Sequence, residues 1–94
     1  MSVPRTFRRT PRALWRRVGD EVLVADAEGS DVSSLSASAS AAWLLLEEPR
    51  TREELIDGLV AGCELPAIEV AKHVDRMLHE FERREWVVRV VDDG

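Results

Sequence analysis

The sequence is poor in the residues that build cross-links and membrane spans. Cys63 is its one cysteine, so the chain cannot form an internal disulfide. The longest unbroken apolar run, Ala41–Leu46, is far too short for a transmembrane helix, and no apolar secretion segment follows Met1. We therefore expect a soluble protein of the reducing cytoplasm with no membrane partner.

Residue patterns typical of catalysis and metal binding are also missing. His73 and His79 are six residues apart, which places them about 240° apart around a helix, so they cannot chelate one metal ion. The sequence has no Gly-rich phosphate loop, and no base or Gly-flanked turn accompanies the serines of residues 33–40. It therefore predicts no catalytic residue, no metal site and no cofactor, and hence no enzyme.

Length and charge limit the number of domains and the class of partner. Ninety-four residues suffice for one domain with a modest core. The net charge is −5, with 13 Lys and Arg against 18 Asp and Glu, which disfavours a nucleic-acid partner. The only charged side chains in residues 1–17 are arginines. Because residues 1–12 show no apolar periodicity, they are interpreted as a basic flexible arm that precedes a folded domain of residues 13–91.

Several segments of the domain are typical of β-strands. Leu14–Val18 and Val22–Val24 flank Gly19-Asp20-Glu21, which predicts a hairpin. The alternation of Asp31–Leu35 is brief and partly polar, which predicts an edge strand, and the three segments together form an N-terminal three-stranded β-meander. Trp86–Val91 predicts a short C-terminal strand or hairpin.

Three helices are predicted between these strands. The first covers residues 37–48, because Pro49 forces the residue before it out of the helical region. Thr51 and Glu54 have the spacing of a capping box at the start of the second helix. Pro66 suits the first turn of the third helix. The expected class is α+β, a winged helix-turn-helix with a three-helix bundle.

The third helix has an apolar stripe about 120° wide, formed by Ala67, Val70, Ala71, Val74, Met77, Leu78 and Phe81. Its bulky residues, Val70, Val74, Met77 and Phe81, are expected in the core. The small Ala67 and Ala71, with Leu78, lie towards one edge of the stripe. Small residues beside an edge strand leave a shallow groove.

The order and spacing of four segments resemble the stand-alone PqqD-like family: Trp15–Val24, Leu35–Leu46, Arg50–Leu55 and Val70–Phe81. The resemblance covers residues 11–91 and implies a peptide-binding winged-helix domain. Members of that family bind the leader of a ribosomally synthesised precursor peptide as an added strand. They then present it to a modifying enzyme or leader protease. This chain departs from the family pattern at Arg84-Glu85-Trp86, where a small residue is usual, and in its Arg-rich start.

Strand addition needs an open edge, which supplies main-chain hydrogen bonds, and a side-chain wall, which supplies specificity. The edge is predicted to consist of Asp31, Val32, Ser33, Ser34 and Leu35. The wall is predicted to consist of Ala67, Ala71, Val74, Asp75 and Leu78 on the third helix. Asp31, Asp75 and Glu82 favour a leader that carries Lys or Arg at the rim.

The alternative function is a winged-helix DNA-binding transcriptional regulator, with the third helix as its recognition helix. Such a helix needs Lys and Arg to neutralise phosphates and to read base edges. The exposed face instead balances Glu69, Asp75, Glu80 and Glu82 against Lys72, Arg76, Arg83 and Arg84. A purely structural subunit is the remaining alternative, and leader binding is the preferred interpretation.

Overall fold

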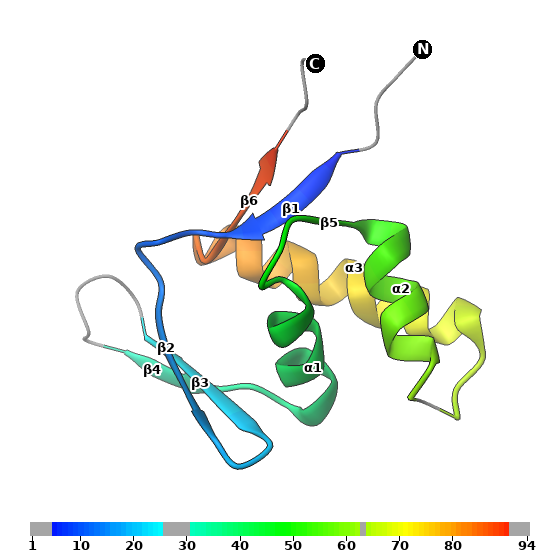
Figure 1. Cartoon of the computed structure of the whole chain (residues 1–94), viewed down its shortest axis with the longest axis horizontal. Coiled ribbons are helices and arrows are strands. Elements are labelled where there is room, and N and C mark those ends of the chain that lie inside the picture. Colours follow the sequence, from blue (N-terminus) through cyan, green and yellow to red (C-terminus); the bar gives the residue numbers. More distant parts are fainter. Residues whose placement is uncertain (1–4, 26–30, 63, 91–94) are drawn as a thin grey trace.

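Two small antiparallel sheets and three helices make up the fold (Figure 1). The computed structural model describes residues 5–25, 31–62 and 64–90. The first sheet has the order β2-β3-β4, formed by Leu14–Val18, Glu21–Ala25 and Val32–Ser34. Gly19 and Asp20 connect β2 to β3, and Gly19 adopts a φ of 62°, which glycine tolerates without strain. The predicted hairpin and the edge strand are both confirmed.

The second sheet joins the two ends of the described chain. Its central strand is β1 (Thr6–Arg9), which pairs antiparallel with β5 (Arg50–Thr51) and β6 (Val87–Val90). Phe7 of β1 is buried. The prediction of a flexible arm is therefore wrong for residues 6–9, because one apolar side chain and the pairing with β6 suffice to order them. Residues 1–4 and Val91 lie outside the described residues.

The three helices follow the predicted order. They are α1 (Ala37–Leu45), α2 (Arg52–Val60) and α3 (Ala67–Arg83). Helix α1 ends at Leu45, three residues earlier than predicted, and Leu46 is its C-cap. The capping box is confirmed: the Thr51 hydroxyl accepts from the Glu54 N–H at 3.1 Å, and the Glu54 carboxylate accepts from the Thr51 N–H at 2.9 Å.

An aromatic cluster at the centre of the core connects the two sheets. Trp43 of α1 is fully buried, and its ring meets three others edge to face. The centroid distances from Trp43 are 6.3 Å to Trp15 on β2, 5.6 Å to Phe81 on α3 and 6.2 Å to Trp86, which precedes β6. Helix α3 therefore packs against a core to which both sheets contribute.

Candidate functional site: an open strand edge beside helix α3

Strand β4 is one of the two edge strands of the first sheet, and the register shows which of its backbone groups point away from β3. The Leu35 N–H donates to the Val22 C=O at 2.9 Å. Pairs bonded in this way alternate along an antiparallel ladder, so Ser33 and Val24, which face each other, form the next such pair. Ser33 therefore uses its N–H and C=O towards β3. The N–H and C=O of Val32 and Ser34 point away from the sheet, where an added strand would bond to them.

A buried serine fixes the end of this strand. Ser40 of α1 is 1% exposed, and its hydroxyl accepts from the Val22 N–H at 3.1 Å and donates to the Leu35 C=O at 3.3 Å. These two bonds satisfy backbone groups just where the ladder ends. Sequence reasoning assigned no role to Ser40, and a serine within a serine-rich stretch carries no signal that would identify it.

The predicted edge residues lie together. Asp31 is exposed at the start of β4, Val32 and Ser34 have exposed side chains, and Ser33 is partly buried. Ser33 shares a face with the buried Val24, so its side chain points inward, towards α3. Leu35 packs against the core. The strand assignment made from the sequence therefore agrees with the observed edge.

The predicted helix residues do not form a wall beside this edge. Ala67 is exposed in the first turn of α3, Ala71 is half-buried and Val74 is 1% exposed. Asp75 is hydrogen-bonded to Arg52 of α2, with Nη2 and Oδ2 2.9 Å apart. Leu78 is 5% exposed and, with Asp75, borders a hollow lined by Phe7 and Arg89 of the second sheet. Asp75 and Leu78 thus face α2 and the second sheet, and Leu78, not Met77, is the more deeply buried.

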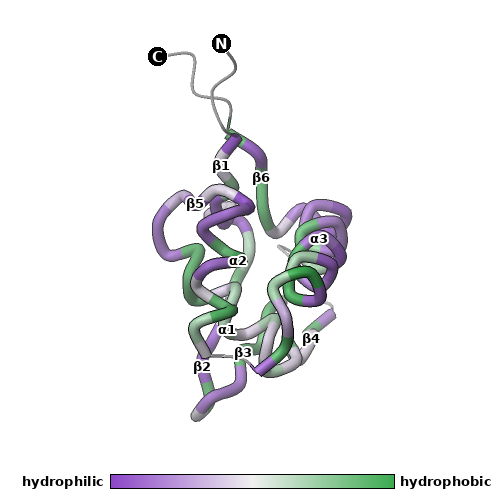
Figure 2. The backbone as a smooth tube through the Cα atoms, turned by 90° about the vertical axis from the view of Figure 1, so that its right-hand side faces the viewer, coloured by the Kyte–Doolittle hydropathy of each residue, from purple (hydrophilic) through white to green (hydrophobic). Residues whose placement is uncertain are grey.

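The residues that reach β4 lie on the other flank of α3. Arg84 Nη1 donates to Ser33 Oγ at 3.0 Å, and Arg84 Nε donates to Glu80 Oε1 at 2.9 Å. In Figure 2, β4 and α3 lie on the same side of the molecule. Met77 and His73 precede Glu80 at helical spacing on this flank. The one sequence signal for the pair is the four-residue spacing of Glu80 and Arg84, which is common on solvated helices.

The electrostatics of this flank are dominated by the arginines. Hydrogen bonds from Arg83 and Arg84 lower the pKa of Glu80 from its ordinary 4.5 to about 2. On the opposite flank, the hydrogen bond from Arg52 lowers the pKa of Asp75. Both carboxylates are therefore ionised at neutral pH.

A mostly apolar hollow lies between the three helices. Small residues leave it open: Ala37 and Ala41 of α1, with Gly58 of α2, form part of its lining. Val70 and His73 of α3 complete the opposite wall.

The part of the chain that the structure describes offers no metal-binding cluster, since no three His, Cys, Asp or Glu side chains there are placed to share an ion. None of the described helices is both long enough and apolar enough to cross a membrane.

Comparison with known proteins gives two matches. A family model described as coenzyme PQQ synthesis protein D (PqqD) matches residues 21–87. A solved structure described as TbiB1 in complex with the TbiA(beta) leader peptide has the same fold, with a TM-score of 0.78 and 22% sequence identity. The match covers 85% of this chain and 93% of that one. No curated protein matches the sequence significantly.

Proposed function

Because this chain belongs to the PqqD family, we propose that it binds the leader segment of a ribosomally synthesised precursor peptide as a strand added to β4. The observation that carries this proposal is the free backbone of Val32 and Ser34, beside a helix that supplies side chains. Main-chain bonds to these groups give affinity, and contacts with α3 give specificity. The leader-bound state of TbiB1, which shares the fold, supports the same role.

The proposal includes delivery of the leader to a modifying enzyme or leader protease, with no catalysis by this protein. Such a partner needs a surface that the leader leaves uncovered. The outer face of the first sheet supplies one, because Leu14 and Val18 of β2 and Val32 of β4 are 57%, 54% and 65% exposed. We place the protein in the cytoplasm, where precursor peptides are made, and regard the domain as a variant of the winged helix-turn-helix.

The charges on α3 do not favour the DNA-binding alternative. Lys72 pairs with Glu69 at 3.7 Å, and Arg83 pairs with Glu80 at 2.8 Å. Arg84 shares the same carboxylate. A recognition helix needs its cations free for phosphates and bases.

The test is a proline placed at the open edge. Ser34→Pro removes the N–H that points away from the sheet, so it should abolish binding of a leader peptide that the wild-type protein binds, as measured by calorimetry. Ser34→Ala keeps that N–H and should bind normally, which controls for loss of the hydrogen bond from Ser34 Oγ to Glu21. Ser33→Pro removes a bond to β3 and should lower the thermal midpoint.

Circular dichroism should show that Ser34→Pro is folded. If that folded variant binds the peptide as tightly as the wild type, strand addition at β4 is excluded.

A further inference from the structure

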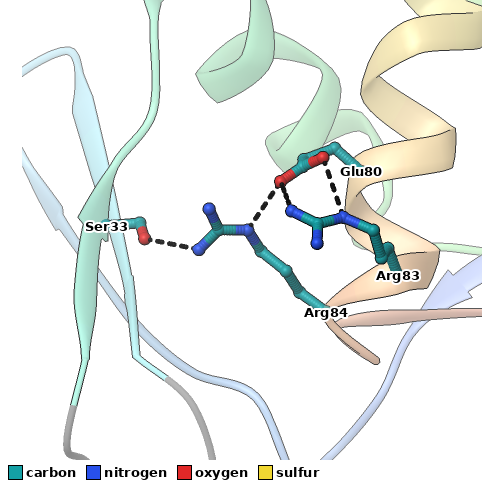
Figure 3. Close-up of polar contacts among 4 residues, drawn as sticks. All are labelled: Ser33, Glu80, Arg83 and Arg84. Carbon is teal, nitrogen blue, oxygen red and sulfur yellow. Dashed lines mark hydrogen bonds and ion pairs between the residues drawn. The ribbon is translucent and has the colours of Figure 1, made fainter.

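An arginine bridges the two elements that would hold the leader. Arg84 follows the last residue of α3, and its guanidinium donates both to Ser33 on β4 and to Glu80 on α3 (Figure 3). Its Cζ also lies 5.1 Å from the centroid of the Trp86 ring. These contacts hold the guanidinium at the inward face of the open edge.

At this end of α3, one carboxylate has two cationic partners. Glu80 is shared, because Arg83 binds it through Nη2 at 2.8 Å and Nε at 3.3 Å, while Arg84 donates to Oε1. Two guanidinium groups therefore face one carboxylate. Arg84 is 40% exposed, and its Nη2 group has no acceptor in the part of the chain that the structure describes.

Two of the neighbouring acids have cationic partners of their own, whereas Glu85, which follows Arg84, is exposed. Glu82 is bound by Arg89 of β6, with Nε and Oε2 2.8 Å apart, and Asp75 is bound by Arg52. These pairs also remove two of the three carboxylates that suggested a leader with Lys or Arg at the rim. Asp31 remains exposed, before the first residue of β4. The expected leader charge therefore reverses beside Ser33.

The strand register places a leader side chain at this arginine. Ser33 bonds to β3, so the leader residue opposite Ser33 forms a non-hydrogen-bonded pair with it across the open edge. The Cβ atoms of such pairs are about 4.5–5.5 Å apart and lie on the same face. The side chain opposite Ser33 thus points inward, towards the Arg84 guanidinium.

We infer that Arg84 is a specificity-determining residue that selects an Asp or Glu of the leader at the position opposite Ser33. This inference rests on the proposed leader-binding function. The unused N–H groups of Arg84 Nη2 donate to the incoming carboxylate, while Nε and Nη1 stay bound to Glu80 and Ser33. Arginine suits this role because its planar fork can hold Glu80, Ser33 and a third acceptor at once.

The experiment selects binders from a displayed library of random peptides with the full chain as bait. Wild-type protein should enrich peptides with Asp or Glu at one fixed position within an extended segment. Arg84→Glu should enrich Lys or Arg at that position, and Arg84→Gln should lose the charge preference. Arg89→Glu is the matched control, because it makes the same charge change at the second sheet and should keep the acidic preference.

Synthetic peptides with the selected sequences are then used to measure how much the acidic residue contributes to affinity. Replacing the acidic residue by Gln should weaken binding to the wild type about tenfold, the lower range for a charged hydrogen bond at a half-exposed site. Exchanging it for Arg should restore binding to Arg84→Glu. A purely structural role of Arg84 would not produce this exchange, and circular dichroism verifies that each variant is folded.

The possible failures are distinguishable. If wild-type protein enriches peptides without an acidic position, or if Arg84→Glu enriches the same acidic peptides, the role of Arg84 is excluded while leader binding stands. If folded wild-type protein enriches no peptide at all, the leader-binding function itself fails.

Discussion

Each of the two sheets is tied to α3 by an arginine, but the two ties differ in charge balance. On the second sheet, Arg89 and Glu82 form a closed one-to-one pair, with two hydrogen bonds of 2.8 and 3.1 Å. On the first sheet, Arg83 and Arg84 share Glu80, and Ser33 provides a neutral acceptor. Arg89 and Glu82 neutralise each other, so this pair does not attract a further charged group. The unbalanced group keeps a donor free beside an open strand edge.

The same comparison distinguishes two free strand edges. The Thr10 N–H donates to the Trp86 C=O at 2.8 Å, so by alternation the N–H groups of Val87 and Arg89 point to the free side of β6. Strand β6 therefore also presents free backbone, as β4 does. The paired Arg89 beside it offers no unused charge. The two edges therefore differ in the side chains beside them: β4 has the unused Nη2 group of Arg84, and β6 has the paired Arg89.

The largest loss of stability is expected from a change in the core that α3 shares with both sheets. Phe81 is 2% exposed and contacts Trp43 and Trp86. Phe81→Ala should lower the free energy of unfolding by about 3–5 kcal/mol, because the cavity cannot collapse fully. Urea unfolding followed by tryptophan fluorescence and by far-ultraviolet circular dichroism measures the loss.

The two probes also test whether the sheets unfold together. Coincident curves are expected for the wild type, since Trp43 links both sheets. Separate midpoints in the two signals would show that the sheets are independent units. Phe81→Leu is the control and should lose less stability, because it keeps most of the buried volume.

A smaller effect is expected from the centre of the second sheet. Phe7→Ala should lower the free energy of unfolding by about 2–3 kcal/mol, less than a fully enclosed phenylalanine, because Phe7 lies in the peripheral sheet and is 7% exposed. Leader affinity measured by calorimetry below the melting transition should stay within about twofold of the wild type, because β4 is on the other sheet.

The urea midpoint of Phe7→Ala reports its stability, and the calorimetric affinity reports its binding of the leader. An unchanged urea midpoint for Phe7→Ala would show that β1 contributes nothing to the fold. A large loss of affinity in a folded Phe7→Ala protein would instead extend the leader site to the second sheet.

Local patterns explain which parts of the fold were predictable. The turn at Gly19-Asp20 and the capping box of Thr51 and Glu54 depend on neighbouring residues, and both were identified correctly. Pro66 was expected in the first turn of α3 and is instead its N-cap, one residue before the helix. Strand β1 was missed because its four residues, Thr-Phe-Arg-Arg, contain one apolar side chain. Its order depends on pairing with β6, about eighty residues later in the chain.

For a related reason, the sequence predicted the position of the edge strand but not the neighbours of α3. Alternation along β4 marks an edge strand, and the structure places β4 at an edge of the first sheet. The apolar stripe of α3 shows which face is buried, but it does not show which neighbour lies on each flank. Asp75 and Leu78 were therefore assigned to β4, whereas they lie towards α2 and β1. Arg84 was missed because its partner Ser33 is 51 residues away in the sequence.

The smallest effect is expected in the pH dependence of stability, through the Glu80 carboxylate. Glu80 has a folded-state pKa of about 2, below its ordinary 4.5, so the folded state favours the carboxylate. Its contribution to stability is complete above pH 4.5 and is lost as the pH falls through that value towards 2. The effect should be modest, because the side chains of Arg83 and Arg84 are 63% and 40% exposed and solvent screens the pairs. Urea midpoints of the wild type and Glu80→Gln should differ at pH 6 and converge as the pH approaches 2, since other carboxylates titrate alike in both proteins. A difference that stays constant over this range would mean that the shared Glu80 group does not stabilise the fold, and that Arg84 is held at β4 by Ser33 and Trp86 alone.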